Sequence, residues 1–244
     1  MNLRLKLVLC SAALLSCAPG IAEGADVTAQ FTVRPGAAAH AAAGKSARRP
    51  VLNDIVLWLT RADDSTPLRA ATPPKTGYRL VQKDKMFSPH LLVVPAGSNV
   101  EFPNLDPFFH NVFSLFNGKR FDLGLYESGT HRSVRFEREG VSYIFCNIHP
   151  EMGAIVLALN SPYFAASAVG GAVTIRDVPP GKYYLHVWGE QFQAADPGLE
   201  HRIVEVTTQG TWLGPIELAP GPNPLMNHKN KFGEDYPATP TPTY

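Results

Sequence analysis

Short runs of alternating apolar and polar residues, separated by turns, recur along most of the chain and constrain its fold more than any other feature. A period of two places every second side chain on one face, as in a strand with one buried face. Proline and glycine, 22 and 20 of the 244 residues, separate these runs, which is typical of strands joined by tight turns. The pattern predicts an all-β protein, a β-sandwich or a barrel, with strands that include residues 27–33, 51–60, 91–94, 141–145, 155–159, 183–188 and 212–218.

Other classes of protein are disfavoured by the same sequence. No segment has the period of about 3.6 residues of a long amphipathic helix, and only residues 163–169 are a candidate for a short one. The formal net charge of +1 comes without a basic stripe, which argues against a nucleic-acid partner. The sequence lacks the signatures of serine and zinc hydrolases and of phosphate and dinucleotide sites. We therefore expect a protein that is not an enzyme.

The first residues have the pattern of an export signal. Arg4 and Lys6 precede an apolar run, residues 7–15, that is short for a membrane span. Small residues predict cleavage after Gly24, which makes residues 1–24 a signal peptide and the mature chain periplasmic. The alternative is a lipoprotein signal that leaves Cys17 lipidated and the chain anchored to a membrane.

Cysteine usage then singles out one side chain. Cys10 and Cys17 lie in the signal region, so cleavage after Gly24 leaves Cys146 as the single cysteine of the mature chain. A lone thiol in an oxidising compartment has no partner for an internal disulfide. It is therefore either buried and inert or in use as a ligand or nucleophile.

The residues that follow Cys146 favour a metal ligand. Residues 146–152 read Cys-Asn-Ile-His-Pro-Glu-Met at the end of a predicted strand, so Cys146, His149 and Met152 fall within one turn. Two histidine nitrogens and a cysteine sulfur in a trigonal set, with a weak axial methionine, are typical of an electron-transfer copper site. Pro150 stiffens the turn by fixing its own φ. Zinc is a weaker alternative, because methionine does not suit it.

The second histidine has to come from elsewhere, and His110 is the best candidate. It stands where a loop enters a new strand, so we expect it at the rim of the sandwich, near the strand end that carries Cys146. The alternative for His110 is a core histidine that hydrogen-bonds to the backbone, and the alternative for Cys146 is a buried, unreactive thiol. Met86 and His90 are weaker candidates, interpreted as a packing methionine and a surface histidine. The other histidines are assigned solvated or structural roles: His131, His186, His201 and His228.

Residues 86–160 resemble a cupredoxin domain. The resemblance rests on the segment Val100-Glu101-Phe102, on His110-Asn111-Val112-Phe113, and on the Cys-x-x-His-Pro-x-Met turn, which is similar to that of amicyanin. It implies one type 1 copper, with His110, Cys146 and His149 as equatorial ligands and Met152 as the axial ligand.

The resemblance also implies features around the copper. The backbone N–H of Asn111 is expected to reach the Cys146 sulfur and to tie the two ligand segments together. Electrons are expected to leave through an exposed edge of His149, within an apolar patch supplied by Phe108, Phe109 and Pro150.

The strands on either side of residues 86–160 need a core of their own. Residues 26–62 carry two predicted strands and residues 163–219 about four, so neither group makes a stable two-layer core alone. Residues 173–188 read strand, Pro-Gly turn, strand and resemble a carboxypeptidase-regulatory (transthyretin-like) sandwich. Two further segments, Pro162-Tyr163-Phe164-Ala165 and His228-Lys229-Asn230-Lys231-Phe232-Gly233, make the whole chain resemble bacterial methylamine-utilisation or plastocyanin-like proteins. Both flanks are therefore expected to form one Ig-like sandwich into which the cupredoxin domain is inserted.

The predicted organisation is a signal peptide at 1–24, N-terminal strands of the Ig-like sandwich at 25–75, the cupredoxin domain at 76–160, the remaining Ig-like strands at 161–220 and an extended, unpacked tail at 221–244. The predicted function is periplasmic single-electron transfer by Cu(I)/Cu(II) cycling, by a monomer that meets an unidentified redox partner protein. The alternatives are copper delivery or storage, and a metal-free envelope module in which the Ig-like strands bind a glycan or protein.

Overall fold

The computed structural model is an all-β molecule, which confirms the predicted fold class. It describes residues 24–34, 52–63, 77–115, 118–221, 223, 225 and 228–236, and the predicted signal region and Cys17 lie outside them. Within these ranges the single helix is the 3₁₀ turn η1 (Leu199–His201). The candidate helix at 163–169 is wrong, because β13 (Phe164–Ala166) instead pairs with β2 (Val56–Arg61). No helix in the described part of the chain is long and apolar enough to cross a membrane.

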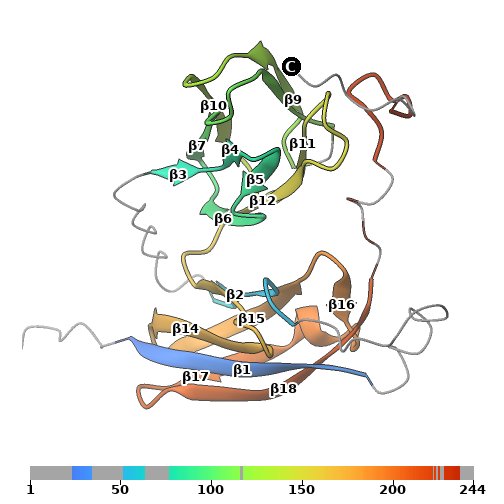
Figure 1. The fold of residues 1–244 in the computed structure, drawn as a ribbon. Coiled ribbons are helices and arrows are strands. Elements are labelled where there is room, and N and C mark those ends of the chain that lie inside the picture. Colours follow the sequence, from blue (N-terminus) through green and yellow to red (C-terminus); the bar gives the residue numbers. More distant parts are fainter. Residues whose placement is uncertain are drawn as a thin grey trace, which may run out of the picture.

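The strands form two sandwiches, one above the other in Figure 1. The lower sandwich has two four-stranded sheets packed face to face. Their orders are β14-β1-β18-β16 and β13-β2-β15-β17. The strands not yet given are β1 (Ala25–Val33), β14 (Ala172–Val178), β15 (Gly181–Trp188), β16 (Phe192–Ala194), β17 (Ile203–Val206) and β18 (Thr211–Pro220).

The core of the lower sandwich follows from the alternation in its strands. In β1, Val27, Ala29 and Phe31 are buried and face the second sheet, while the intervening side chains are more exposed. β1 lies between β14 and β18, so strands from both ends of the chain share one sheet. β2 and β13 are neighbours in the other sheet, and the chain between them forms the upper sandwich.

The upper sandwich has a five-stranded sheet of order β6-β12-β11-β8-β9 facing a three-stranded sheet of order β10-β7-β3 and the hairpin β4-β5. In the first sheet, the strands are β6 (Leu91–Pro95), β8 (His110–Ser114), β9 (Phe121–Tyr126), β11 (Gly140–Phe145) and β12 (Gly153–Leu159). The others are β3 (Tyr78–Arg79), β4 (Val81–Lys83), β5 (Met86–Ser88), β7 (Ser98–Pro103) and β10 (His131–Phe136).

Strand β12 joins the two sandwiches. Every residue of this strand after Gly153 is buried, because one face packs in the upper core and the other meets the lower sandwich. Ala154, Val156 and Ala158 belong to the upper core, whereas Leu157 and Leu159 pack with Val56, Trp58 and Trp188 of the lower sandwich. A strand buried on both faces reads as a nearly continuous apolar run, which matches the sequence of β12.

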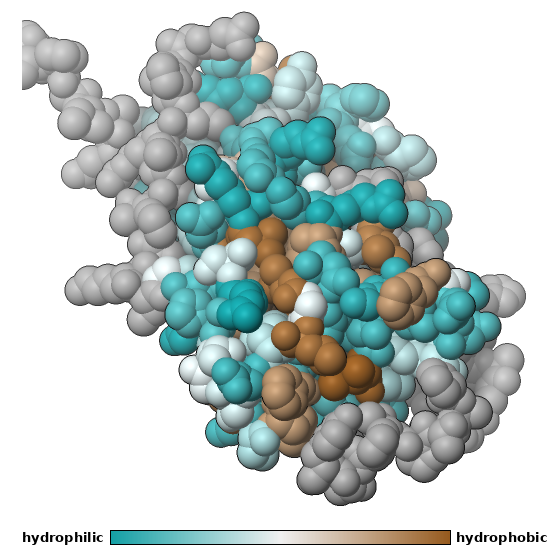
Figure 2. Space-filling model, turned by 90° about the horizontal axis from the view of Figure 1, so that it is seen from above, coloured by the Kyte–Doolittle hydropathy of each residue, from teal (hydrophilic) through white to brown (hydrophobic). Residues whose placement is uncertain are grey.

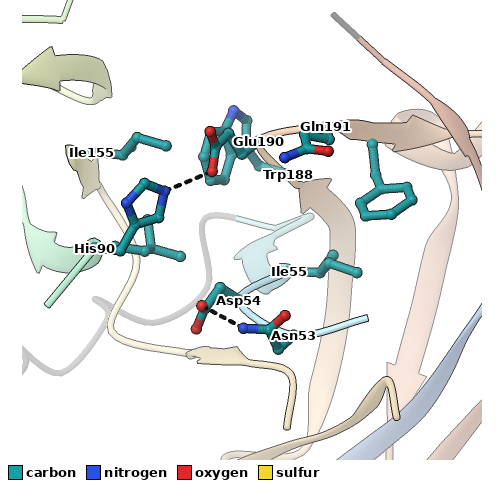
Figure 3. A pocket seen from close by; sticks show the side chains of 10 residues that line it. Asn53, Asp54, Ile55, His90, Ile155, Trp188, Glu190 and Gln191 are labelled. Carbon is teal, nitrogen blue, oxygen red and sulfur yellow. Dashed lines mark hydrogen bonds and ion pairs between the residues drawn. The ribbon is translucent and has the colours of Figure 1, made fainter. Parts of the chain in front are cut away.

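A cavity of about 350 Å³ opens beside this junction. His90 of the upper sandwich reaches across it to Glu190 of the lower one, with Nε2 2.7 Å from the carboxylate, while Asp54 and Trp188 line the same space (Figure 3). The hydrogen bond that His90 donates to the Glu190 carboxylate raises the pKa of His90. The two sandwiches are therefore held by apolar contacts at β12 and by an ion pair at the rim.

The predicted unpacked tail is wrong for the residues that the structure describes. Residues 228–236 return from the lower sandwich and lie against the turn between β11 and β12. This segment, the C-terminal strap, is rich in side chains that hydrogen-bond, and its irregular backbone carries no periodicity that a sequence pattern would reveal.

Candidate metal centre

The predicted ligands come from two neighbouring strands of the five-stranded sheet. His110 is the first residue of β8, and the turn of residues 146–152 joins the end of β11 to the start of β12. β11 and β8 are antiparallel, with Phe145 opposite Phe113. Because the two strands run in opposite directions, the residues after Phe145 continue toward the beginning of β8. Sheet register thus brings Cys146 to His110 across 36 residues of sequence.

Two imidazoles converge on one buried thiol. The Cys146 sulfur is 3.6 Å from Nδ1 of His110 and 3.5 Å from Nδ1 of His149. The ligand atoms of these three residues all lie within 4.8 Å of one another. Within the described ranges this is the one group of three or more His, Cys, Asp or Glu side chains close enough to hold a metal ion.

The spacing of these atoms fits a shared ion. Typical metal–sulfur and metal–imidazole bonds of about 2.3 and 2.0 Å, at an angle near tetrahedral, put the two donor atoms about 3.5 Å apart. Cys146 and His110 are fully buried and His149 is 4% exposed, so water has little access to the three donors. A thiolate with two imidazoles is a donor set that copper accepts readily.

Met152 closes the turn. Its backbone N–H donates to the carbonyl of His149 at 3.0 Å, and its carbonyl accepts from the N–H of Cys146 at 3.2 Å. The side chain is 1% exposed and belongs to the same buried cluster as Cys146. The backbone of the turn therefore keeps Met152 near the cysteine, in line with its predicted place as fourth ligand.

The surroundings of Cys146 disfavour the thiolate form. Burial raises the pKa of the thiol, although backbone N–H groups of Asn111, Ile148 and His149 donate to the sulfur and act in the opposite direction. The Asn111 contact is the one that the cupredoxin resemblance implied, and it is confirmed. A bound metal ion would supply the positive charge that ionises a buried thiol.

The orientation of His110 is fixed by Asp106, a residue that the sequence analysis missed. Nε2 of His110 donates to the Asp106 carboxylate at 2.8 Å. The same carboxylate accepts the backbone N–H groups of Asp84 at 2.6 Å and Lys85 at 3.0 Å, in the turn between β4 and β5. Because the proton sits on Nε2, the lone pair of Nδ1 faces Cys146, as a metal ligand requires.

Protonation states in this group favour ligation. Burial lowers the pKa of His110 more than the Asp106 carboxylate raises it. Burial tends to raise the pKa of Asp106, but hydrogen bonds from Lys85, His110 and Asp84 outweigh it and the pKa is lowered. Burial, followed by the proximity of His110, lowers the pKa of His149 to about 4. At neutral pH both imidazoles are neutral and Asp106 is ionised.

The expected exposed edge of His149 is reduced to a small area. Phe108 lies against both ligand imidazoles, 5.2 Å from the ring of His110 and 5.7 Å from that of His149. Its neighbour Phe109 is 53% exposed, as are large parts of Leu105 and Leu125 in the same sandwich. The end of the molecule seen from above carries a band of apolar side chains between polar ones (Figure 2).

The remaining sequence candidates have other partners or are exposed. Met86 is 61% exposed, so its interpretation as a packing residue is wrong. His90 pairs with Glu190, and His186 stacks on Trp58 with ring centroids 5.0 Å apart. His131 and His201 are exposed. His228 has a structural role in the strap, where it stacks on Phe145.

Comparison with known proteins finds likeness over part of the chain. No family model matches, and no curated protein matches. A purple cupredoxin from Nitrosopumilus maritimus is 26% identical and covers 34% of this chain and 99% of its own, with a TM-score of 0.31. Amicyanin from Paracoccus versutus is 21% identical, covering 41% and 97%, with a TM-score of 0.32. A copper-containing nitrite reductase from Thermus scotoductus is 21% identical, covering 41% and 25%, with a TM-score of 0.33.

Proposed function

We propose that this protein binds one type 1 copper through His110, Cys146, His149 and Met152 and uses it to carry single electrons. The observation that supports the proposal most is the convergence of two Nδ1 atoms on one buried thiol, at 3.6 and 3.5 Å. A thiolate and a thioether suit Cu(I), and imidazoles suit both oxidation states. Zinc fits less well, because a structural zinc site rarely takes methionine as its fourth ligand.

The protein's own part in this function is to hold the ligands still. Copper supplies the change of oxidation state. Asp106 fixes the tautomer and rotation of His110, and the backbone N–H of Asn111 holds the sulfur of Cys146. The backbone bonds between Met152 and the two residues His149 and Cys146 limit movement of the turn. Ligands that move little between the two oxidation states keep the reorganisation cost of electron transfer small.

The partner is proposed to be a redox protein that docks near Phe108 and Phe109. Phe108 contacts both ligand imidazoles, and Phe109 beside it is half exposed, so this segment is the short route from the buried ligands to solvent. Export to the periplasm, with or without a lipid at Cys17, is part of the same proposal. The mass of the mature chain isolated from the native cell envelope distinguishes cleavage after Gly24 from lipidation at Cys17.

The decisive experiment is the visible absorption and EPR spectrum of the copper-loaded chain beside a Cys146→Ser variant. We expect an intense thiolate-to-copper band in the wild type and its loss in the variant, with reversible oxidation and reduction. A colourless site that retains only Cu(I) would favour copper delivery or storage. Failure to take up one equivalent of copper would refute the metal centre and favour the metal-free module.

A further inference from the structure

The C-terminal strap touches the ligand turn at points spread along its length. The Tyr236 hydroxyl donates to the backbone carbonyl of Cys146 at 3.0 Å. The backbone N–H of Lys231 donates to the side-chain oxygen of Asn147 at 3.0 Å. Nε2 of His228 donates to the carbonyl of Pro150 at 2.8 Å. These contacts flank both Cys146 and His149, so the strap covers the turn from its first residue past its histidine.

The strap also packs on the strand that leads into the turn. The His228 ring stacks on Phe145, with centroids 3.8 Å apart and planes 20° from parallel. The ring of Tyr236 is roughly perpendicular to that of His228, with the centroids 5.2 Å apart. Aromatic pairs in such geometries stabilise a contact beyond the burial of their area. Phe145, the last residue of β11 and the neighbour of Cys146, is thus covered by the strap.

A third set of contacts links the strap to the other ligand segment. Nζ of Lys231 donates to Asp122 at 2.8 Å, and the second oxygen of that carboxylate accepts from Nδ2 of Asn111 at 2.7 Å. Asn111 follows His110 directly, and its own backbone N–H donates to the Cys146 sulfur. The Lys231–Asp122 pair is partly exposed, so alone it contributes little. The hydrogen bonds of Tyr236 and His228 to carbonyls of the turn are therefore expected to contribute most to holding the strap in place.

We propose that the C-terminal strap, residues 228–236, is a positioning element that holds the ligand turn in its ligating geometry before a metal ion arrives and slows the ion's departure. The second half of this proposal rests on the proposed copper function, whereas the first concerns the metal-free chain. Two backbone hydrogen bonds lie within the turn, from Cys146 to Met152 and from Met152 to His149. Ordering the turn in advance removes part of the entropic cost of binding.

This role also bears on the choice between electron transfer and copper delivery. A carrier that hands over its metal needs a turn that opens readily, whereas an electron carrier needs ligands that stay in place. A strap tied to both ligand segments opposes opening. Along the chain, the strap follows β18, the last strand of the lower sandwich. The turn is therefore held by a segment that is connected to the lower sandwich.

The test uses the full chain with Tyr236→Phe and His228→Phe, which keep an aromatic ring at each position and remove the hydrogen bonds to the Cys146 and Pro150 carbonyls, respectively. Lys229→Met is the matched control, because Lys229 lies in the same strap but pairs only with Asp235 at a well-exposed site. In the metal-free proteins, hydrogen exchange of the Cys146 and Met152 amides is measured. A lost hydrogen bond of about 0.5–1.5 kcal/mol corresponds to about 2- to 10-fold faster exchange in the two Phe variants and no change in the control.

In the copper-loaded proteins, the rate of copper transfer to a chelator and the thiolate-to-copper band are compared. We expect transfer about 2- to 10-fold faster in both Phe variants and a shifted band. Faster exchange in the metal-free variants supports the positioning role even if the wild type takes up no copper, an outcome that refutes only the copper function. Wild-type exchange in both Phe variants, or equal acceleration in Lys229→Met, would overturn the proposal.

Discussion

Replacing Asp106 by asparagine should weaken both the metal centre and the fold around it. One carboxylate oxygen accepts the N–H of Asp84, and the other accepts Lys85 and Nε2 of His110. An amide has a single acceptor oxygen, so an asparagine that preserves the bonds to Lys85 and His110 turns its NH₂ group toward the N–H of Asp84. One bond is then replaced by two facing donors, and the other two become neutral.

The expected loss follows from these three bonds. Hydrogen bonds to a charged acceptor contribute about 1.5–3 kcal/mol each, neutral ones about 0.5–1.5, and an unpaired buried donor costs about 1–3. Relief from burying a carboxylate offsets part of this loss. We expect the metal-free Asp106→Asn protein to lose about 3 kcal/mol of unfolding free energy in urea. Loss of a partner that orients a ligand should also lower copper affinity about 10- to 100-fold.

The control for this variant is Asp84→Asn. Asp84 is exposed and has a φ of 56°, a conformation that asparagine tolerates. The Asp84→Asn substitution also removes one negative charge close to the site, but it changes no contact of His110. The stability and copper affinity of this variant should therefore stay close to wild type. Because the pKa of Asp106 is lowered in the fold, its stabilising contribution is present above its unfolded pKa, about 3.9, and is lost as pH falls through the folded value. An Asp106→Asn protein within about 0.5 kcal/mol of wild type, with unchanged copper affinity, would refute this reasoning.

Other positions give independent tests. Met152→Leu conserves volume and should cost less than about 1.5 kcal/mol of unfolding free energy in urea. Cyclic voltammetry should show a changed reduction potential, because a thioether near the copper tunes that potential. An unchanged potential would exclude Met152 as a ligand. Leu157→Ala, on the face of β12 toward the lower sandwich, should cost about 2–5 kcal/mol by calorimetry or urea unfolding, and a smaller loss would mean that this face is not a true core. Glu190→Gln should remove about 0.2–1 kcal/mol at low salt, since His90 is half exposed. The folded pKa of His90 is raised, so this contribution is full below its unfolded pKa and fades as pH rises through the folded value; a difference that persists at high pH would contradict the ion pair.

Strands with a clear period were predictable from the sequence alone. The predicted strand at 27–33 corresponds to β1 and that at 155–159 to β12, because each contains enough alternating or continuous apolar residues to define a buried face. The hairpin β4-β5 was missed, since strands of three residues contain too few positions to show a period. Residues 163–169 alone are compatible with a short helix, and the pairing of β13 with β2, about 100 residues earlier, decides their conformation.

In the candidate site, too, residues that form a local sequence pattern were predictable and residues brought together only by the fold were not. One short turn carries three metal-binding side chains, so sequence reasoning could find Cys146, His149 and Met152. His110 could be found because it is the first residue of a strand. Asp106 lies only four residues before His110, so an acidic residue at that spacing was the available signal. Tyr236 lies 90 residues from Cys146, and no local pattern links a hydroxyl to a carbonyl at that distance.

Two of the connections between the sandwiches, strand β12 and the C-terminal strap, meet at the ligand turn. β12 starts where the ligand turn ends, and its outer face, with Leu157 and Leu159, is buried against the lower sandwich. The strap leaves β18 of the lower sandwich and returns to the other end of that turn through Tyr236 and Cys146. The turn is therefore fixed at both ends by contacts that depend on the lower sandwich. Loosening the junction by Leu157→Ala should accordingly increase hydrogen exchange at the Cys146 amide, although Leu157 has no place among the ligands; an unchanged rate would show that the turn is ordered by the upper sandwich alone.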